Sequence, residues 1–480
     1  MKFKYSIFIS LIIVFFSCKP EIKDGFQPSN GSADFSKYVA LGNSLTAGYA
    51  DGALYNSAQS QSWTSILANQ LKEVGGGDFI QPVVDSEQGV LAGKLKLGLV
   101  NGQLLPTLAD DGELEAFYPP IGYTVNNLGV PGAKVSHLLA PGYGNIQNLA
   151  AGQANPYFIR FASSPNISVL EQAMSLQASF FSLWIGNNDV LGYASSGGAF
   201  DEITPLDQFE QYYGLLAQTL ASSGVKGVLA NIPDVTSAAY FNTIPGDALE
   251  VDANLATQMN FGISLIESNL NSILTQIGME AYSYNIEFAA GKNRFLIEDN
   301  SFPYRDLLNA IADTTTNPET KMLMHLIQFR QMQEGELLTL QTPQDSLAMG
   351  MGSFMTIPGS ALPVPYGIPN RFVLDTEELN IIGQTIENYN DVIEQTAQNY
   401  GWAFVDVNNR FNKMKDGVVV DGIELNAEFV TGGIFSLDGI HLTPRGNAVV
   451  ANFFIEEINK KYGAAISSVS INEYNGVEFP

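Results

Sequence analysis

Residues 37–44 read KYVALGNS, and this stretch decides the fold class. Its middle is almost wholly apolar, a pattern typical of a short strand that is buried on both faces of a parallel sheet. Four further runs have the same character and are also predicted to be strands. They are Tyr123–Val130, Phe180–Ile185, Gly227–Ile232 and Ala403–Val407.

Helical patterns lie between these runs. They cover Trp63–Lys72, Phe209–Leu220, Leu255–Ile277, Leu379–Ala397 and Ala448–Ile458. Asp375 and Glu378 form a capping pair before the fourth helix, and Thr443-Pro444 supplies the cap and first residue of the last one. Strands that alternate with helices predict an α/β fold, in which an open parallel sheet is covered by helices on both sides.

The predicted elements do not fill the 480 residues. Loops longer than about 12–15 residues are usually functional or disordered, so the long Gly/Pro-rich stretches are interpreted as insertions. We expect one α/β domain over residues 37–465, followed by a C-terminal tail at 466–480. The insertions are expected at about 75–120, 137–165 and 287–369.

Six of the eleven methionines lie within Met322–Met355, in the third insertion. Methionine is flexible and fills irregular apolar spaces. Two interpretations are open: the methionines pack the insertion itself, or they form a soft lid over an acyl pocket.

The first 17 residues have the pattern of a secretory signal. Lys2 and Lys4 precede the apolar stretch Tyr5–Phe16, which is too short to span a bilayer in the usual way. Ser17-Cys18 at its end resembles the junction of a bacterial lipoprotein signal, which implies lipidation at Cys18. We then expect residues 18–36 to be a flexible tether, and the protein to be exported and held at the outer membrane, in the periplasm or at the cell surface. Ordinary secretion and an uncleaved anchor are the alternatives.

Charge narrows the range of partners. The chain has 23 Lys+Arg against 49 Asp+Glu, a formal net charge of -26. This balance argues against nucleic acid and against electrostatic docking on anionic lipid, because both need clustered basic residues. The single cysteine excludes an internal disulfide and a cysteine-rich zinc site.

Chemistry is expected at the carboxyl ends of the strands, where open α/β sheets bind their ligands. Four blocks of polar or glycine residues stand out, three after predicted strands and one before the last helix. They are Gly42-Asn43-Ser44-Leu45, Asn127–Ala133, Gly186-Asn187-Asn188-Asp189 and Asp438–Pro444.

These blocks contain the groups that a serine hydrolase needs. A serine hydroxyl such as that of Ser44 is a weak nucleophile until a base takes its proton. His441 is one of three histidines and a natural base near neutral pH, and Asp438 could orient its ring. A strand-end glycine N–H and the Asn188 amide could stabilise an oxyanion.

The order Ser, Gly, Asn and Asp-x-x-His resembles the SGNH (GDSL-type) hydrolase family of esterases and lipases, including large bacterial lipoprotein members. The resemblance covers about residues 37–235 and 372–462 and implies a flavodoxin-like three-layer α/β/α sandwich. It implies a Ser44–His441–Asp438 triad, with Ser44, Gly132 and Asn188 as the oxyanion donors.

One residue departs from the family pattern, because Asn43 replaces the usual Asp of the first block. Asn makes similar local hydrogen bonds at a turn, so the nucleophile is unaffected.

Other interpretations of single residues stay open. Ser44 could be a plain helix cap, Gly129 is the rival of Gly132, and Asp406 is the rival of Asp438. Asp189 is expected to support a loop. The remaining candidates are expected to have no chemical role: His137, His325 and the acidic residues Asp110, Asp111, Glu113 and Glu115, which lack calcium-loop spacing.

The sequence therefore predicts an extracytoplasmic, lipid-anchored serine ester hydrolase that works through an acyl-enzyme and needs no metal or organic cofactor. A catalytically silent glycan- or lipid-binding lipoprotein and an acyltransferase are the alternatives. Short acyl esters, acetylated glycans and lipids are all open as substrates.

Overall fold

The structure, a computed structural model, describes residues 27–100, 102–109, 120–355 and 364–480. The predicted signal, Cys18 and the acidic residues 110–115 lie outside these ranges. Within them, no helix has both the length and the apolar character needed to cross a bilayer.

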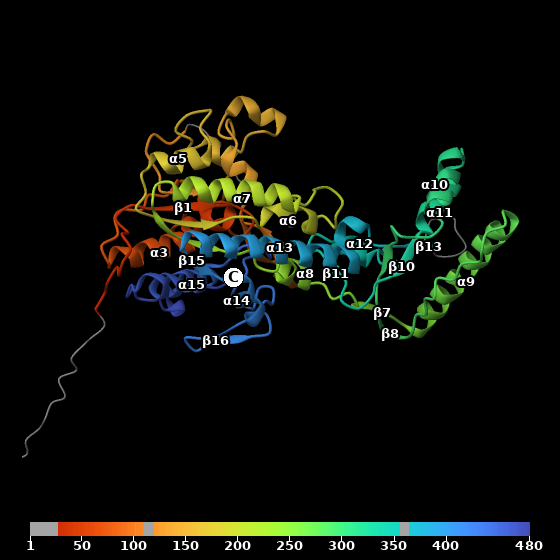
Figure 1. Ribbon diagram of the computed structural model, residues 1–480. Coiled ribbons are helices and arrows are strands. Elements are labelled where there is room, and N and C mark those ends of the chain that lie inside the picture. The colour runs from red at the N-terminus through yellow and green to blue at the C-terminus, as the bar shows by residue number, and fades with distance from the viewer. Residues whose placement is uncertain (1–26, 101, 110–119, 356–363) are drawn as a thin grey trace, which may run out of the picture.

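A five-stranded parallel sheet forms the centre of the molecule (Figure 1). Along the sheet the strands lie in the order β15-β6-β5-β1-β4, which is 5-4-3-1-2 in chain order and is the flavodoxin-like arrangement. The strands coincide with the five apolar runs, so the α/β prediction is confirmed. Their bounds are β1 Tyr38–Gly42, β4 Asn127–Gly129, β5 Phe180–Trp184, β6 Lys226–Ala230 and β15 Ala403–Val405.

Helices cover both faces of the sheet (Figure 1). On one face α3 packs against α15, where the rings of Trp63 and Phe454 stack at 4.2 Å. On the other face α7 packs against α13, where Phe209 and Tyr389 stack at 3.8 Å. The bounds of these helices are α3 Trp63–Lys72, α5 Val169–Ser175, α7 Leu206–Ala221, α13 Thr376–Tyr400 and α15 Pro444–Tyr462.

The predicted helix starts are confirmed. Asp375 accepts a hydrogen bond from Glu378 N, and the Glu378 side chain accepts one from Asp375 N, so α13 begins with a capping box. Thr443 caps α15 by accepting from Gly446 N, and Pro444 occupies the first helical position.

Residues 244–355 and 364–369, between β6 and α13, form an arm that projects from the body (Figure 1). The arm has its own apolar cluster, in which Met259, Leu274 and Leu308 are fully buried. The third insertion therefore begins well before the predicted residue 287 and includes α9. Its elements are β7 Leu249–Val251, α9 Ala253–Gln276, β8 Gly291–Asn293, β9 Leu296–Glu298, α10 Arg305–Thr314, α11 Pro318–Leu326, β10 Phe329–Gln331, β11 Leu337–Leu338, α12 Gln344–Ala348, β12 Ser353–Met355 and β13 Val364–Tyr366.

Three of the six methionines of residues 322–355 pack inside the arm, whereas Met322 and Met349 are exposed. Met324, Met332 and Met351 are buried in its apolar clusters. Among the described residues, none from 322–355 lines the pocket beside Ser44, so the packing interpretation is favoured over the lid.

Shorter elements complete the body. A β-hairpin, β2 Leu95–Val100 and β3 Gln103–Leu108, lies in the first insertion. The second insertion holds mostly short helical turns. The other elements are α1 Ser44–Ala47, α2 Asn56–Ser60, η1 Val135–Leu139, η2 Ile146–Ala151, α4 Pro156–Ile159, α6 Asn188–Ser195, η3 Val235–Ser237, α8 Ala239–Asn242, η4 Asn370–Phe372, β14 Val373–Leu374, α14 Val407–Met414, β16 Val418–Val420, β17 Ile423–Leu425 and η5 Ile471–Glu473.

Both ends of the described chain pack on the body. Ser29 and Ala465 exchange backbone hydrogen bonds of 3.2 and 2.7 Å, and Phe35 is 1% exposed and packs edge-on against Phe180. The expected tether therefore does not extend to Ser36, because residues 29–35 belong to the packed body. The expected tail is packed as well, since Ile471 is fully buried.

Candidate active site

Ser44 lies at the sharp turn between β1 and α1. Gly42 allows the turn, because a Cβ on it would lie 2.4 Å from the carbonyl oxygen of Trp184. Asn43 caps α1 by accepting from Leu45 N at 3.1 Å, and its amide donates to Asn187 Oδ1 at 3.3 Å. An aspartate could accept the first bond but could not donate the second, so the unusual asparagine has a structural use here.

Ser44, His441 and Asp438 form a continuous hydrogen-bonded chain, although 397 positions separate the first two residues. Ser44 Oγ lies 2.8 Å from His441 Nε2, and His441 Nδ1 lies 2.8 Å from Asp438 Oδ2. The side chains of His441 and Asp438 are each 14% exposed. The structure thus brings the three predicted side chains together at the carboxyl edge of the sheet.

Asp438 is held as an anion. Its Oδ1 accepts from the backbone N–H groups of Ile440 and His441 at 2.9 and 2.8 Å. Burial acts to raise the pKa of Asp438, but the charge of His441 and these hydrogen bonds together hold it well below its ordinary range. An ionised Asp438 accepts the Nδ1 proton of His441, which leaves Nε2 free to accept the proton of Ser44.

A tight turn at Asp51-Gly52 supports Asp438. Ala50 and Ala53 exchange backbone hydrogen bonds of 3.0 and 2.9 Å around it, and the two turn residues have φ angles of 52° and 77°. This is the left-handed conformation of a two-residue hairpin turn, which the pair Asp-Gly favours. Gly52 N donates to Asp438 Oδ2 at 2.8 Å.

The Asp51 side chain fixes this turn to the loop before His441. Its Oδ1 accepts from Leu437 N at 2.9 Å, and its Oδ2 accepts from the Tyr55 hydroxyl at 2.6 Å. Burial raises the pKa of Asp51. Asp51 was not predicted from the sequence as a site residue. The Asp-Gly pair signals a turn, but nothing in the sequence signals what the turn contacts.

Tyr49 is a second neighbour of the triad that was not predicted from the sequence. Its ring lies 4.7 Å from the imidazole of His441, and its hydroxyl donates to the carbonyl oxygen of Gly52. The ring therefore restricts the movement of His441 on one side.

The three predicted oxyanion donors lie on neighbouring elements. The backbone N–H of Ser44 is in the first turn of α1, and Asn188 opens α6 and donates to the carbonyl oxygen of Ala133 at 2.9 Å. This bond joins α6 to the turn that contains Gly132, whose φ of 78° suits a glycine. Ser44 and Asn188 line one pocket, whereas Gly132 is not among its lining residues.

Within the described ranges, no hydrogen bond occupies the backbone N–H of Ser44 or of Gly132. The rival Gly129 is different. Its N–H donates to Asn127 Oδ1 at 2.9 Å, and a Cβ on it would lie 2.4 Å from Ala47 N. Gly129 therefore serves the close packing of α1 on β4.

Asp189 supports a loop, as expected. It is fully buried, and it accepts from Val135 N at 3.0 Å and from the Thr204 hydroxyl at 2.8 Å. Burial raises its pKa to about 6.

Asp406, His137 and His325 have partners other than Ser44 and His441. Asp406 caps α14 and accepts from the Asn231 amide at 2.8 Å. His137 accepts from Lys134 N and stacks on Tyr143, and His325 is in α11 of the arm. None of these residues has a hydrogen bond to the Ser44–His441 pair.

A narrow apolar pocket of about 50 Å³ opens beside Ser44 and His441. Its apolar walls come from both halves of the chain. They include Trp184, Leu191, Val235, Ala238, Phe411 and Phe435. In the part of the chain that the structure describes, no group of three or more His, Cys, Asp or Glu side chains could hold a metal ion.

The sheet order and the site together define an α/β protein of flavodoxin-like topology with a serine–histidine–aspartate cluster at its carboxyl edge. No family model and no curated protein matches the chain. Solved structures that it is similar to include LAE5, an α/β hydrolase from the metagenome of Lake Arreo, at 13% identity, a TM-score of 0.34, and coverage of 91% of this chain and 98% of that one.

Two further solved structures are similar at the same level. A variant of Axe2, an acetyl-xylooligosaccharide esterase from Geobacillus stearothermophilus, has 12% identity and a TM-score of 0.32, with 89% and 96% of the two chains covered. A protein described as a GDSL-like lipase from Parabacteroides merdae has 10% identity and a TM-score of 0.33, with 90% and 99% covered. At these scores, the function of this chain has to be inferred from its own residues.

Proposed function

We propose that the protein is a serine ester hydrolase, with Ser44 as the nucleophile, His441 as the base and Asp438 as the acid of the triad. The observation that carries the proposal is the pair of 2.8 Å hydrogen bonds that link Ser44, His441 and Asp438 at the mouth of an apolar pocket. A serine that merely capped a helix would need neither the imidazole nor the carboxylate.

The reaction follows from this geometry. As Ser44 Oγ bonds to the ester carbonyl carbon, its proton passes to His441 Nε2. The bond between the carbonyl carbon and the leaving oxygen then breaks, and His441 returns the proton to that oxygen, which leaves as an alcohol. Water next gives a proton to His441 and attacks the acyl-enzyme, which releases the acid and restores the Ser44 hydroxyl.

Three donors would stabilise the oxyanion in both steps: the backbone N–H groups of Ser44 and Gly132, and the Asn188 amide. The Asn188 amide has a second hydrogen after its bond to Ala133. Loss of one such donor typically costs about 3–4 kcal/mol of transition-state stabilisation.

The apolar pocket favours short acyl groups. The pocket at Ser44 is narrow, at about 50 Å³, and apolar side chains form most of its walls. Acetyl to butyryl esters match this size, whereas long fatty acyl chains do not.

Hydrolysis of p-nitrophenyl esters tests the activity. We expect turnover of the acetate and butyrate esters, weak turnover of the octanoate ester, and a loss of at least about 10³-fold in kcat for Ser44→Ala. Ser60→Ala is the matched control, because Ser60 is exposed on α2. Hydrolysis by Ser44→Ala at the wild-type rate would show that another group performs the chemistry.

Two alternatives keep the same fold. An acyltransferase would pass the acyl group from Ser44 to an alcohol or sugar, so product analysis with an added acceptor separates it from a hydrolase. A catalytically silent glycan- or lipid-binding protein would hydrolyse none of the esters.

We also propose that the protein is exported and lipid-anchored at Cys18. The support is the order of basic residues, apolar stretch, Ser17 and Cys18 in the sequence. When it is expressed in a bacterium that lipidates such signals, the wild type should partition into the detergent phase of Triton X-114 and incorporate a labelled fatty acid. Cys18→Ser should do neither, and lipid incorporation by that variant would contradict attachment at Cys18.

A further inference from the structure

An open cleft of about 900 Å³ lies next to the pocket at Ser44. The cleft and the pocket share Asp234 and Ser237 in their linings, so they are adjacent on either side of this turn. Asn231 follows β6 and Asp406 follows β15, so the cleft continues the carboxyl edge of the sheet on which Ser44 lies. Ligands of open α/β sheets bind at this edge.

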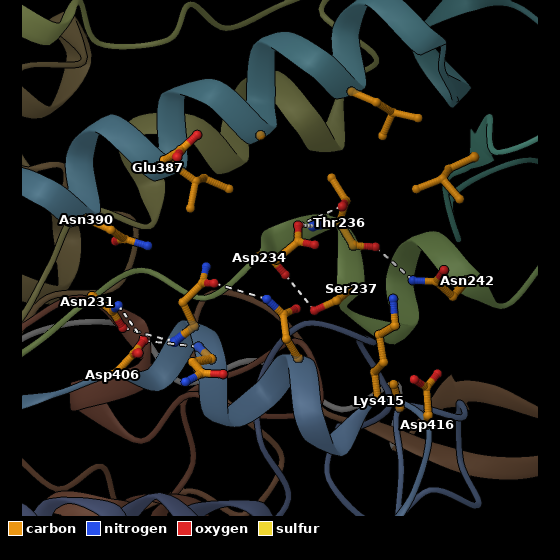
Figure 2. A pocket seen from close by; sticks show the side chains of 18 of the residues that line it. Asn231, Asp234, Thr236, Ser237, Asn242, Glu387, Asn390, Asp406, Lys415 and Asp416 are labelled. Carbon is orange, nitrogen blue, oxygen red and sulfur yellow. Dashed lines mark hydrogen bonds between the residues drawn. The ribbon is translucent and has the colours of Figure 1, made fainter.

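Figure 2 shows how the cleft is built. Glu387 and Asn390 come from α13 on one side, and Asp406 and Lys415 come from the region of α14 on the other. The turn that contains Asp234 lies between these two sides. A ligand in the cleft could therefore contact side chains of both walls and of the turn nearest Ser44.

Amide side chains hold the floor of the cleft rigid. The Asn231 amide donates to Asp406 Oδ1 at 2.8 Å, and Asn231 Oδ1 accepts from Asn408 N at 3.0 Å. The Asn390 side chain both accepts from and donates to the backbone of Ile232, at 2.8 Å in each case. Polar groups that are fixed in this way lose little conformational entropy when a ligand binds.

Two carboxylates on this floor retain a free oxygen. Asp234 Oδ1 accepts from the backbone and hydroxyl of Thr236, and Asp406 Oδ1 accepts from Asn231 and from Asn409 N. Among the described residues, nothing donates to the second oxygen of either side chain. A carboxylate oxygen is a strong acceptor for hydroxyl groups.

The charge of the cleft selects against anions. Lys415 is its one basic side chain among the described residues, against six carboxylates: Asp234, Glu387, Asp391, Asp406, Asp416 and Glu428. These carboxylates do not form a metal-binding group in the described ranges. The fixed amides and the free carboxylate oxygens can bind the hydroxyl groups of a neutral ligand, and the excess of carboxylates disfavours an anionic one.

We propose that this cleft binds the neutral glycan portion of an acylated oligosaccharide. The ester reaches Ser44 past Asp234 and Ser237, and the sugar that leaves as the alcohol stays in the cleft. The assignment of the glycan as leaving group rests on the proposed ester hydrolase, but binding of the glycan in the cleft does not.

Gly383 offers a way to block the cleft without disturbing the fold. It lies on α13 at the cleft, and a Cβ on it would meet nothing within 4 Å. Gly383→Trp therefore fills the cleft, and in a helix the change from glycine is favourable. Gly214→Trp on α7 is the matched control, because Gly214 is also an exposed helical glycine with nothing within 4 Å and is outside the cleft.

The first measurement is kcat/KM for acetylated neutral oligosaccharides of glucose, xylose and mannose, divided by kcat/KM for p-nitrophenyl acetate in the same variant. We expect this ratio to fall about tenfold or more in Gly383→Trp, the effect of losing about 1.4 kcal/mol of binding, and to stay at the wild-type value in Gly214→Trp. An unchanged ratio in Gly383→Trp across the whole panel would overturn the cleft proposal while leaving the ester hydrolase intact.

The second measurement is calorimetric binding of the same oligosaccharides, without acyl groups, to Ser44→Ala. Binding that Gly383→Trp abolishes supports the cleft even if no ester is hydrolysed, in which case only the proposed hydrolase fails. Tighter binding of oligogalacturonate than of the neutral oligosaccharides, or no binding of any of them, would overturn the proposal.

Discussion

Asp438 and Asp406 show how the surroundings of a side chain decide its role. Both lie near the carboxyl edge of the sheet, but Asp438 contacts an imidazole and three backbone N–H groups, whereas Asp406 contacts an amide and a helix N-terminus. Because the pKa of Asp438 is lowered in the folded state, its contribution to stability is fully present above the ordinary pKa of an aspartate and is lost as the pH falls from there through the lowered pKa.

A first prediction concerns Asp51 as a positioning residue for Asp438. Asp51→Ala removes the bonds to Leu437 N and to the Tyr55 hydroxyl, so the turn that presents Gly52 N to Asp438 loses its attachment. We expect kcat for p-nitrophenyl acetate to fall about tenfold with KM nearly unchanged, because the change affects the alignment of His441 and leaves the acyl pocket intact.

Asp51→Asn is the conservative variant for this prediction. An asparagine can accept from Leu437 N through its oxygen, can donate to the Tyr55 hydroxyl and tolerates the left-handed turn. It should recover most of the wild-type kcat. Equal losses in the alanine and asparagine variants, or a loss confined to KM, would contradict a positioning role.

The elements that form the sheet were predictable because their signal is local. A run such as Phe180–Trp184 is almost wholly apolar, and Asp375 and Glu378 form a capping box that can be recognised within four residues. The extent of the arm was not predictable. Helix α9 has an apolar stripe like that of α13. Such a stripe predicts that the helix is packed on one face, but it does not predict whether the partner is the sheet or another part of an insertion.

A second prediction concerns Asp189, which joins η1 to α6. Its pKa is raised to about 6 from an ordinary 3.8, so the folded state binds the proton more tightly than the unfolded state. The contribution to stability is therefore fully present below about pH 4 and is lost as the pH rises through 6. An uncharged asparagine can accept from Val135 N through its oxygen and donate to the Thr204 hydroxyl through its amide. Asp189→Asn should be more stable than the wild type by about 1–3 kcal/mol at pH 8 and nearly equal to it at pH 4.

Urea unfolding at several pH values checks this expectation. Asp313→Asn on α10 is the control, because Asp313 is an exposed carboxylate in the arm and its replacement should leave the pH profile unchanged. A stability difference between Asp189→Asn and the wild type that does not grow from pH 4 to pH 8 would rule out the buried charge as its cause.

At the scale of the molecule, the body and the arm each have their own apolar core, and a smaller cluster contains Met332 of the arm together with Val373 of the body. Leu308 is fully buried in the cluster of the arm, and Leu216 is fully buried in the cluster of the body. Because each core holds its own elements together, we expect a destabilising substitution in one core to unfold mainly the part that contains it.

The third prediction follows from these two cores. Leu308→Ala should destabilise the arm by about 2–4 kcal/mol and expose it to limited proteolysis, while kcat/KM for p-nitrophenyl acetate stays near the wild-type value. Leu216→Ala, the matched variant in the body, should lower the temperature at which activity is lost. A single melting transition that both variants shift equally would show instead that the two cores unfold together.

The candidate site was predictable to the extent that each of its residues belongs to a recognisable block. Ser44, Asn188, Asp438 and His441 each follow or precede an element at the expected place, and the sheet order then brings them to one edge. The residues that surround and support the triad were not predictable. Tyr49 and Asp51 come from a loop with no periodic pattern, and their use depends on contacts with residues almost 400 positions away.

The pairing of Ser29 with Ala465 has a consequence for how the proposed anchored protein faces its membrane. Helix α15 starts beside His441 and ends beside Ser29, and its 19 residues span about 28 Å. On attachment at Cys18, the polypeptide thus leaves the bilayer and enters the body at the edge of the sheet opposite Ser44. The mouth of the pocket therefore lies at the end of the body away from the point where the proposed anchor segment enters it.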